Sequence, residues 1–258
     1  MKFQLLPSTI DENGRASARQ HLTCFIIDDL VAFDAGSLAM AATQIHRDQI
    51  RDIVLTHAHL DHIAGLPLFV DDLFAVLETP IRVHASPEVI EIIERDVFNW
   101  HVYPSFSELT NEFGPVLEYF PFSIGRSFNA GHLTITPSAV NHKVPTAGFV
   151  IDDGTTAIAI TGDTAETNAF WPSISEIERL SAIFIECAFP DEMADLAAIS
   201  HHLTPSSLKT ELSKFTGRRC PIYLINLKPM YREQIAKEIA SLEIADLSIL
   251  EVGKVYEF

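Results

Sequence analysis

The most constraining feature of this chain is a group of metal-binding residue types directly after an apolar run. Ile53-Val54-Leu55-Thr56 has the composition of a buried strand, and His57-Ala58-His59-Leu60-Asp61-His62 follows it at once. Burying His and Asp side chains without partners is costly, whereas neutral imidazole and carboxylate are ordinary ligands of zinc-like ions. In a loop, alternating positions can direct His57 and His59 at one ion and leave the other two ligands for a second ion. The motif therefore predicts a metal site rather than a chance group of solvated histidines.

Length and charge limit the classes of protein and of substrate. The 258 residues suit either one domain with a large core or a tight pair of repeated halves, and 47% hydrophobic with 21% charged residues is typical of a globular chain. Acidic residues outnumber basic ones by 35 to 18, which gives a formal charge of −17. Such a chain disfavours long nucleic acids, which bind through several Lys and Arg contacts to phosphates. A small anion can still enter a cleft that contains cations.

No targeting or membrane segment is expected. No apolar run reaches the ~20 residues that span a bilayer, and the segment Met1–Pro7 becomes polar too soon for a signal peptide. We therefore expect a cytoplasmic protein that does not bind membranes. The three cysteines, Cys24, Cys187 and Cys220, are odd in number and widely spaced. We predict no disulfide and no thiolate nucleophile, with Cys24 and Cys187 buried in strands.

Short apolar runs alternate with turn residues and helical stretches, which is typical of an α/β protein. Hairpins are predicted around Asp28-Asp29 and around Asp152-Asp153-Gly154, and they argue against a purely parallel sheet. Helices are predicted at residues 62–77, 87–98, 205–215 and 231–242, and strands at residues 23–28, 30–34, 52–56, 82–85, 132–138, 147–151, 157–161, 182–186, 222–225 and 248–250. The aromatic-rich segment 100–128 contains several Pro residues, and we expect it to be an insertion or lid on a single domain of residues 1–258.

Further elements flank the His motif in an order that resembles a known family. Phe33-Asp34-Ala35-Gly36 precedes the motif, and Val140-Asn141-His142 and Ile160-Thr161-Gly162-Asp163-Thr164 follow it. Alone, an Asp before Gly is usually a turn former and an isolated His is usually a surface or core residue. In this order they resemble the motifs of the metallo-β-lactamase superfamily. The resemblance extends from Phe33 to Tyr231 and implies an αββα fold, a four-layer sandwich of two mixed sheets with helices on the outside.

The resemblance also implies the cofactors and the site residues. Two divalent metal ions are implied, with zinc expected and manganese as the alternative. Asp163 is the implied bridging ligand, and Asp61 is also a candidate catalytic residue. The implied metal ligands are His57, His59, Asp61, His62, His142 and Asp163, and the residues implied to orient them are Asp34 and Thr56.

Downstream residues resemble the phosphodiesterase branch, which includes ribonuclease Z and the class II cyclic nucleotide phosphodiesterases. The resemblance lies in Glu186, within Ile183–Phe189, and in His202, within His202-Leu203-Thr204-Pro205. It implies a hydrogen-bonded Glu186–His202 pair that gives a proton to the leaving oxygen, and such help is worth ~100–10,000-fold in rate. The alternative is that Glu186 caps a strand and His202 lies on the surface. The neighbouring His201 takes a position where the family has a small residue, and we expect it to be incidental.

One position departs from the family pattern. The family has a metal-binding His at a strand end where this chain has Asn226, in Leu224-Ile225-Asn226-Leu227-Lys228-Pro229. An amide oxygen can ligate a metal but is a poorer donor than imidazole for ions such as zinc. Asn226 is therefore a candidate ligand of the second ion. A weaker second site, a preference for manganese, an inactive enzyme and an engineered substitution all stay open.

The resemblance implies a metal-dependent phosphodiesterase that attacks with a metal-bound hydroxide. Because the acidic charge disfavours long RNA, we expect 3′,5′-cyclic nucleotides as substrates, with cAMP as the leading one. Lys228 is a candidate phosphate contact. The expected partner is a small nucleotide, and the resemblance implies a homodimer. The alternatives are a ribonuclease Z-like or other phosphodiesterase, a thioester or lactone hydrolase, and a degenerate binding protein with an impaired second metal site.

Overall fold

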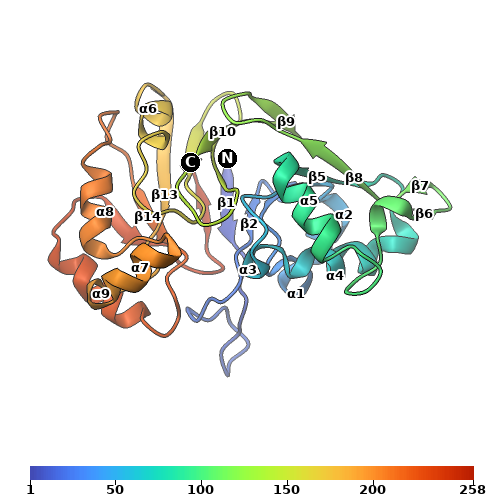
Figure 1. Ribbon diagram of the computed structural model, residues 1–258, viewed down its shortest axis with the longest axis horizontal. Helices are drawn as coiled ribbons and strands as arrows, with labels where there is room; N and C mark the ends of the chain where they lie inside the picture. Colours follow the sequence, from blue (N-terminus) through green and yellow to red (C-terminus); the bar gives the residue numbers. More distant parts are fainter. The chain divides into compact units, whose positions relative to one another are not determined.

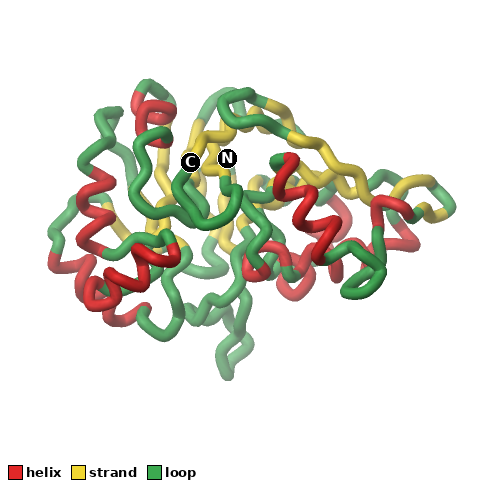
Figure 2. Tube along the Cα trace, in the orientation of Figure 1, coloured by secondary structure: helices red, strands yellow, loops and turns green.

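The computed structural model describes residues 1–258, and the chain divides into two compact units. The first unit contains Met1–Ser123 and Val252–Glu257, and the second contains Ile124–Glu251 and Phe258. Figure 1 follows the chain through both units from blue to red, and Figure 2 separates their helices and strands by colour. No helix in either unit is both long enough and apolar enough to cross a membrane.

Seven strands of the first unit form one mixed sheet in the order β16-β1-β2-β3-β4-β5-β8. These strands are β1 (Lys2–Leu5), β2 (Phe25–Ile27), β3 (Val31–Phe33), β4 (Asp52–Val54), β5 (Ile81–Ala85), β8 (Leu117–Pro121) and β16 (Val255–Glu257). Neighbours from β16 to β3 are antiparallel, and neighbours from β3 to β8 are parallel. The predicted hairpin between β2 and β3 is confirmed. Its Asp28 and Asp29 have φ of 51° and 61°, the positive values that a tight hairpin turn requires.

The helices of the first unit cover an apolar core beside this sheet. They are α1 (Leu38–Ala41), α2 (Gln44–Gln49), α3 (Leu60–Ile63), α4 (Gly65–Leu73) and α5 (Pro87–Asp96), with the 3₁₀ turns η1 (Phe74–Val76) and η2 (Phe106–Glu108). The helix predicted over residues 62–77 begins earlier, at Leu60, and is divided at Ala64 into α3 and α4. Helix α5 begins as predicted, because Ser86 caps it and Pro87 occupies its first position.

The aromatic-rich segment contributes regular structure to the first unit. Its strands β6 (Thr110–Asn111) and β7 (Gly114–Pro115) form a small hairpin, and β8 pairs with β5 in the main sheet. The structure therefore gives residues 117–121 a place in the sheet, and a lid function for the segment stays a prediction.

A buried ion pair connects two strands of the first sheet. Asp52 on β4 accepts hydrogen bonds from Arg82 Nε and His84 Nε2 on β5, both at 2.8 Å. Burial raises the pKa of the Asp52 carboxyl, but the hydrogen bonds from Arg82 and His84 outweigh burial and hold that pKa well below its usual range. The ionised form of Asp52 therefore stabilises the contact between the strands.

The second unit also has a seven-stranded mixed sheet, in the order β15-β14-β13-β12-β11-β10-β9. Its strands are β9 (Phe128–Ala130), β10 (Leu133–Ala139), β11 (Ala147–Asp152), β12 (Ala157–Ile160), β13 (Leu180–Glu186), β14 (Ile222–Ile225) and β15 (Leu247–Ile249). Neighbours from β9 to β12 are antiparallel, and those from β12 to β15 are parallel. In both sheets three antiparallel strand pairs are therefore followed by three parallel pairs, although the sequence shows no repeat. In this succession β3 corresponds to β12, and these strands precede Asp34 and Asp163 respectively.

The helices of the second unit are α6 (Phe170–Ser175), α7 (Ala194–Ser200), α8 (Pro205–Leu212) and α9 (Arg232–Ser241), with the 3₁₀ turn η3 (Asp191–Met193). Helices α8 and α9 pack side by side (Figure 1). Glu211 on α8 is fully buried and accepts hydrogen bonds from Trp171 Nε1 at 2.7 Å, from Thr167 N at 3.1 Å and from the Lys214 ammonium. Since Thr167 lies in the segment after β12, Glu211 connects α8 to the loop that carries Asp163.

Cys24 and Cys187 are buried as predicted, but neither lies within a strand: Cys24 directly precedes β2 and Cys187 directly follows β13. Cys24, Cys187 and Cys220 are all buried and free. Burial raises the pKa of each thiol, to about 11 at Cys220. These groups are therefore protonated at neutral pH and are poor nucleophiles.

Candidate metal centre

The first group of site residues lies where β3 and β4 end in the first unit. These strands are parallel and pair Phe33 with Val54, so the residues that follow them emerge at the same edge of the sheet. Asp34 follows β3 and is 1% exposed. Its carboxylate accepts hydrogen bonds from Thr56 N at 2.8 Å and from Thr56 Oγ1 at 2.9 Å. The two strand ends are therefore joined through Asp34.

The same carboxylate orients a histidine of the motif. His62 Nδ1 lies 2.6 Å from Asp34 Oδ2, and His57 Nδ1 lies 2.9 Å from Thr56 Oγ1. Because both Nδ1 atoms are engaged in this way, Nε2 is the nitrogen that each ring can offer to an ion. A metal centre needs ligands oriented in this manner, and the contacts of Asp34 and Thr56 suit the orienting role that we predicted for them.

The three imidazoles of the motif are packed closely. The ring centroid of His57 lies 4.6 Å from that of His59 and 4.1 Å from that of His62. His57 is fully buried and His62 is 1% exposed. Protonated imidazoles at such distances would repel one another, whereas neutral ones can surround a cation. This donor set, with Asp61 beside it in the chain, fits a zinc-like ion.

A glycine allows the backbone of the motif to approach β3. Gly36 N donates to Thr23 O, Thr23 N donates to Asp61 O, and Ala35 N donates to His62 O, at 2.7–2.8 Å. A Cβ atom at Gly36 would lie 2.0 Å from Asp61 O, a distance that no pair of nonbonded atoms can occupy. The turn after β3 therefore requires glycine at this position to hold the loop of the His57–His62 motif.

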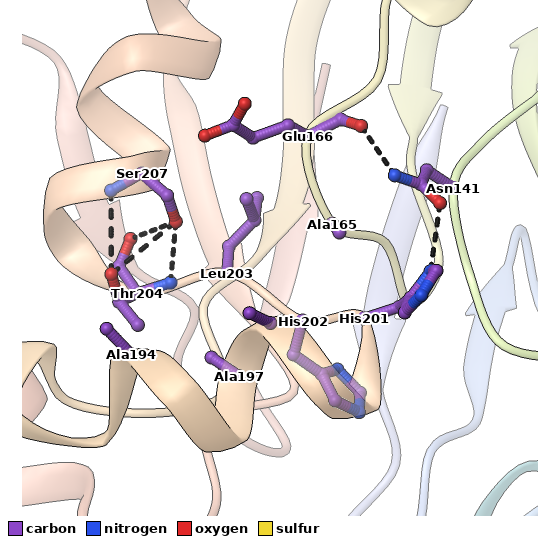
Figure 3. Close-up of a pocket in the computed structure, with 11 residues that line it drawn as sticks. Asn141, Ala165, Glu166, Ala194, Ala197, His201, His202, Leu203, Thr204 and Ser207 are labelled. Atoms are coloured by element: carbon purple, nitrogen blue, oxygen red, sulfur yellow. Dashed lines mark hydrogen bonds between the residues drawn. The ribbon is translucent and has the colours of Figure 1, made fainter.

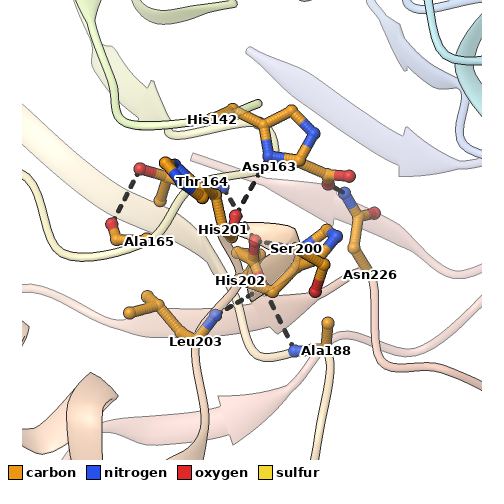
Figure 4. A network of polar contacts seen from close by, with 12 residues as sticks. His142, Asp163, Thr164, Ala165, Ala188, Ser200, His201, His202, Leu203 and Asn226 are labelled. Carbon is orange, nitrogen blue, oxygen red and sulfur yellow. Dashed lines mark hydrogen bonds and ion pairs between the residues drawn. The ribbon is translucent and has the colours of Figure 1, made fainter. Parts of the chain in front are cut away.

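The second group lies at the ends of three parallel strands of the second unit. Strands β12, β13 and β14 are neighbours, and the segments that follow or end them carry Asp163, Glu186 and Asn226. The parallel arrangement brings these residues to one edge of the sheet although they are far apart in the sequence. Asp163 is 2% exposed and Glu186 is fully buried. Figure 4 shows Asp163 and Asn226 together with His142 and His202.

Glu186 is saturated by hydrogen bonds. Its Oε1 accepts from Thr164 N at 2.7 Å, and its Oε2 accepts from Ala188 N at 3.1 Å and from Leu203 N at 3.2 Å. His202 Nδ1 lies 2.7 Å from Oε1. Although donor atoms of Asp163, Glu186 and His202 lie within 4.8 Å of one another, these bonds leave Glu186 little capacity to ligate an ion. Glu186 is better suited to hold His202 in place.

The environment of His202 favours its protonated form. Burial lowers the pKa of His202, but the hydrogen bond and the charge of Glu186 outweigh burial and raise that pKa above its usual range, while the charge of Lys228 opposes them. Burial also raises the pKa of the Glu186 carboxyl. The pair therefore retains a proton between its two side chains. The ring of His202 lies against His142 and Phe189, with centroid distances of 5.0 and 5.6 Å.

Asn226 contacts a predicted metal ligand directly. Its Nδ2 donates to Asp163 Oδ1 at 2.6 Å, so the amide presents its nitrogen to the carboxylate. Asn226 has φ of 56°, a left-handed conformation that Asn adopts more readily than most residues. In this arrangement Asn226 orients Asp163, and ligation of an ion by its oxygen stays a prediction.

His142 is oriented by a residue that we expected to be incidental. His142 Nδ1 lies 3.0 Å from the His201 carbonyl oxygen (Figure 4). His201 Nδ1 lies 2.9 Å from Asn141 Oδ1. His142 Nε2 is therefore the nitrogen available to a metal, as in the first unit. The sequence offered no signal for Asn141 or His201 beyond their position beside predicted site residues.

A cavity of about 370 Å³ lies beside this network within the second unit (Figure 3). Its walls include several alanines and the polar residues Asn141, Glu166, His201 and Ser207. His201 and His202 both line it, so a small molecule that entered the cavity would contact the residues next to the site.

The donor types of both units fit a metal. His57 and His59 in the first unit, and His142 and Asp163 in the second, are residues that could hold a metal ion. Imidazole nitrogens with engaged partners and buried carboxylates are the ligands that zinc sites use.

Comparisons with known proteins agree with this chemistry. The family model described as the beta-lactamase superfamily domain matches residues 29–219. The chain is 25% identical over 228 residues to a probable 3′,5′-cyclic-nucleotide phosphodiesterase of Yersinia pestis, which covers 79% of this chain and 64% of that protein. It is 29% identical over 136 residues to the chloroplastic tRNase Z TRZ2 of Arabidopsis thaliana, which covers 51% of this chain and 34% of that protein. The chain therefore spans less than two thirds of the length of these relatives.

The structural comparison concerns the fold. Unliganded yeast PDE1 matches with a TM-score of 0.77 at 16% identity, over 98% of both chains. The predicted fold class, two mixed sheets with helices, is confirmed by this match and by the observed sheets. Because the family model covers most of its residues, the chain belongs to the metallo-β-lactamase superfamily of hydrolases.

Proposed function

We propose that the chain is a metal-dependent phosphodiesterase that acts on 3′,5′-cyclic nucleotides, with cAMP as the leading substrate. The observation that carries this proposal is the pair of Glu186 and His202, bonded at 2.7 Å close to Asp163. An alkoxide leaving group needs a proton donor, and a histidine held by a buried carboxylate can supply it. The similarity to the Yersinia protein named a probable 3′,5′-cyclic-nucleotide phosphodiesterase supports this substrate class.

The proposal assigns the metal ligands to both units. His57, His59, His142 and Asp163 would hold one ion, and Asp61, His62 and Asp163 would hold the other. Divalent ions bound there would supply a nucleophile at neutral pH and stabilise the charge on the phosphoryl oxygens. Asn226 would act on the second ion through Asp163 or as a ligand.

The residues of the chain itself have distinct tasks in this proposal. His202 would donate its proton from Nε2 to the departing 3′ oxygen, because Glu186 holds its Nδ1. Phe189 packs against the ring of His202 and limits its movement. Lys228 is close enough to affect the pKa of His202 electrostatically, and its ammonium would contact the phosphate.

The test uses the full chain, stripped with a chelator and reloaded with Zn²⁺ or Mn²⁺. We expect hydrolysis of cAMP, with cGMP and bis(p-nitrophenyl) phosphate as comparison substrates, and none without metal. His202→Ala should lower kcat ~100–10,000-fold, whereas His132→Ala, at an exposed position of the same unit, should not. Cleavage of a thioester without cleavage of any phosphodiester would refute the proposal. If the wild-type chain hydrolyses no ester and Asn226→His restores hydrolysis, the wild-type chain has lost a metal ligand. If neither protein hydrolyses any ester, a binding role is favoured.

A tRNase Z-like endonuclease is the second candidate, because 51% of the chain matches the Arabidopsis tRNase Z at 29% identity. The net charge of −17 opposes this candidate, since a long polyanion needs compensating cations. A precursor tRNA in the same assay distinguishes the two. Cleavage of the precursor at lower enzyme concentration than cAMP would select the endonuclease.

A further inference from the structure

The orientation of His142 depends on the backbone of a residue distant in the sequence. Its Nδ1 donates to the carbonyl oxygen of His201, 3.0 Å away. His201 ends α7 in the left-handed conformation, with φ of 57° and ψ of 60°. Glycine is the usual residue at such a helix end, because a Cβ atom makes this conformation unfavourable. The carbonyl that orients His142 is therefore presented by a backbone conformation that the His201 side chain does not favour by itself.

The side chain of His201 has a specific partner that accounts for its presence. Its Nδ1 lies 2.9 Å from Oδ1 of Asn141, the residue directly before His142. The ring is only partly buried and borders the cavity beside the site, so burial of apolar surface does not explain it. The hydrogen bond to Asn141 instead closes a loop of contacts from Asn141 through His201 to the ring of His142.

Asn141 also holds the segment that carries Asp163. Its backbone N donates to Thr164 Oγ1 at 3.0 Å, its carbonyl oxygen accepts from Ala165 N at 2.7 Å, and its Nδ2 donates to Glu166 O at 2.9 Å. Figure 3 shows the contacts of Asn141 with Glu166 and His201. Asn141 thus contacts both the residues after Asp163 and the residue that orients His142.

We propose that Asn141 and His201 form a positioning pair that sets the orientation of His142 and the place of Asp163 for metal binding. The pair acts on the metal only through these two ligands. The proposal rests on the proposed metal centre and adds to it two residues that determine its affinity. Outer residues that orient ligands typically change metal affinity by about 10–100-fold when they are removed.

The first test measures Zn²⁺ affinity of the full chain by competition with a chromophoric chelator. The variants are Asn141→Ala, His201→Gly and the double variant, with Asn168→Ala as an exposed Asn control in the same unit. Glycine permits the left-handed backbone at position 201 without fixing it, so His201→Gly removes the ring that holds the carbonyl in place and adds no strain. We expect each single variant to bind Zn²⁺ about 10–100-fold more weakly, and the double variant to bind no more weakly than the weaker single one. Unchanged affinities, or losses that multiply in the double variant, would overturn the proposal.

The second test reads the tautomer of His142, which a loss of general stability would not alter. In the metal-free wild-type chain with ¹⁵N-labelled histidine, the hydrogen bond to the His201 carbonyl predicts a proton on Nδ1. Both single variants should give a mixture of the two tautomers, and Asn168→Ala should not. If the variants lose Zn²⁺ affinity but His142 keeps only the Nδ1–H tautomer, the pair does not act through the orientation of His142, and the proposal is overturned. Should Asn141→Ala fail to fold, His201→Gly carries both readouts.

These readouts separate this proposal from the proposed function. Neither needs a substrate, and Zn²⁺ binding by the wild-type chain is measured first. A wild-type chain that binds Zn²⁺ but hydrolyses no phosphodiester would refute the proposed function and leave the test of the positioning pair intact.

Discussion

Removal of the Asp34 carboxylate is the most informative perturbation of the first unit. Asp34 is 1% exposed and accepts hydrogen bonds from Thr56 N and Thr56 Oγ1, and it contacts His62 Nδ1 at 2.6 Å. Asp34→Ala removes the carboxylate that accepts hydrogen bonds from the Thr56 amide and the His62 ring, and the loss of each of these two bonds costs about 1–3 kcal/mol. Asp34 also has φ of 55°, and alanine in this conformation costs about 1–2 kcal/mol more. The free energy of unfolding should therefore fall by about 3–8 kcal/mol.

Asp34→Asn separates the two causes. Asparagine tolerates the left-handed backbone, so the strain is absent, but its amide nitrogen must face one of the former donors. We expect a smaller loss, about 1–3 kcal/mol. Urea unfolding of the chelator-treated chain measures both variants without a contribution from bound metal. Zinc affinity, measured separately, should fall about 10–100-fold in Asp34→Asn because His62 loses its orienting partner.

The control is Asp96→Ala. Asp96 pairs with Arg95 on the surface, where both side chains are at least half exposed, and such pairs contribute little. If Asp34→Ala unfolds within about 1 kcal/mol of the wild-type chain, the network at the ends of β3 and β4 does not stabilise the unit as argued. If Asp34→Asn binds zinc like the wild-type chain, Asp34 does not orient a ligand.

Three further perturbations test other contacts. Glu211→Ala should lower the free energy of unfolding by about 3–5 kcal/mol, because it removes a buried carboxylate from three donors. The control Glu176→Ala, at an exposed position, should leave that free energy unchanged. Equal urea midpoints for Glu211→Ala and the wild-type chain would refute the argument. Gly36→Ala should destabilise the first unit by at least about 1–3 kcal/mol and weaken zinc binding, because its Cβ would displace the Asp61 carbonyl; a crystal structure with an unmoved loop would contradict this. Because the pKa of Asp52 is lower in the folded chain than in the unfolded one, ionised Asp52 stabilises the fold at pH values above the unfolded-state pKa of ~3.9. The difference in unfolding free energy between the wild-type chain and Asp52→Asn should therefore begin to narrow as the pH falls below that unfolded-state pKa. A difference that is constant with pH would contradict this prediction.

Local patterns in the sequence predicted many elements correctly because their causes are local. The Asp28-Asp29 hairpin follows from two short apolar runs on either side of turn residues, and the structure has the positive φ values that such a turn needs. Helix α8 begins at Pro205 as predicted, because the preceding Thr204 caps it. The adjacent metal-binding residue types in the run His57–His62 made the candidate ligands of the first unit visible, since no long-range contact is needed to place them near one another.

Elements whose stability comes from distant partners were missed. Strand β8 lies in the aromatic-rich segment, and only its pairing with β5 makes it a strand. Strands β1 and β16 pair the two ends of the chain, a contact between residues about as far apart in the sequence as this chain allows. The motif helix is divided at Ala64, because Gly65 N donates to Ala35 O of the turn after β3. Periodicity within a segment carries no information on such contacts.

The sequence by itself determined the chemistry of the protein: which residues could bind metal, and that apolar strands would present them at their ends. The tertiary structure decided how those residues are held. Parallel pairing of β12, β13 and β14 gathers Asp163, Glu186 and Asn226 at one edge, and the end of α7 places the His201 carbonyl on His142. Hydrogen bonds of this kind depend on angles and distances between segments far apart in the sequence, 60 residues in the case of Asn141 and His201. Side-chain identity predicts that such a contact is chemically allowed, and only the folded backbone determines that it forms.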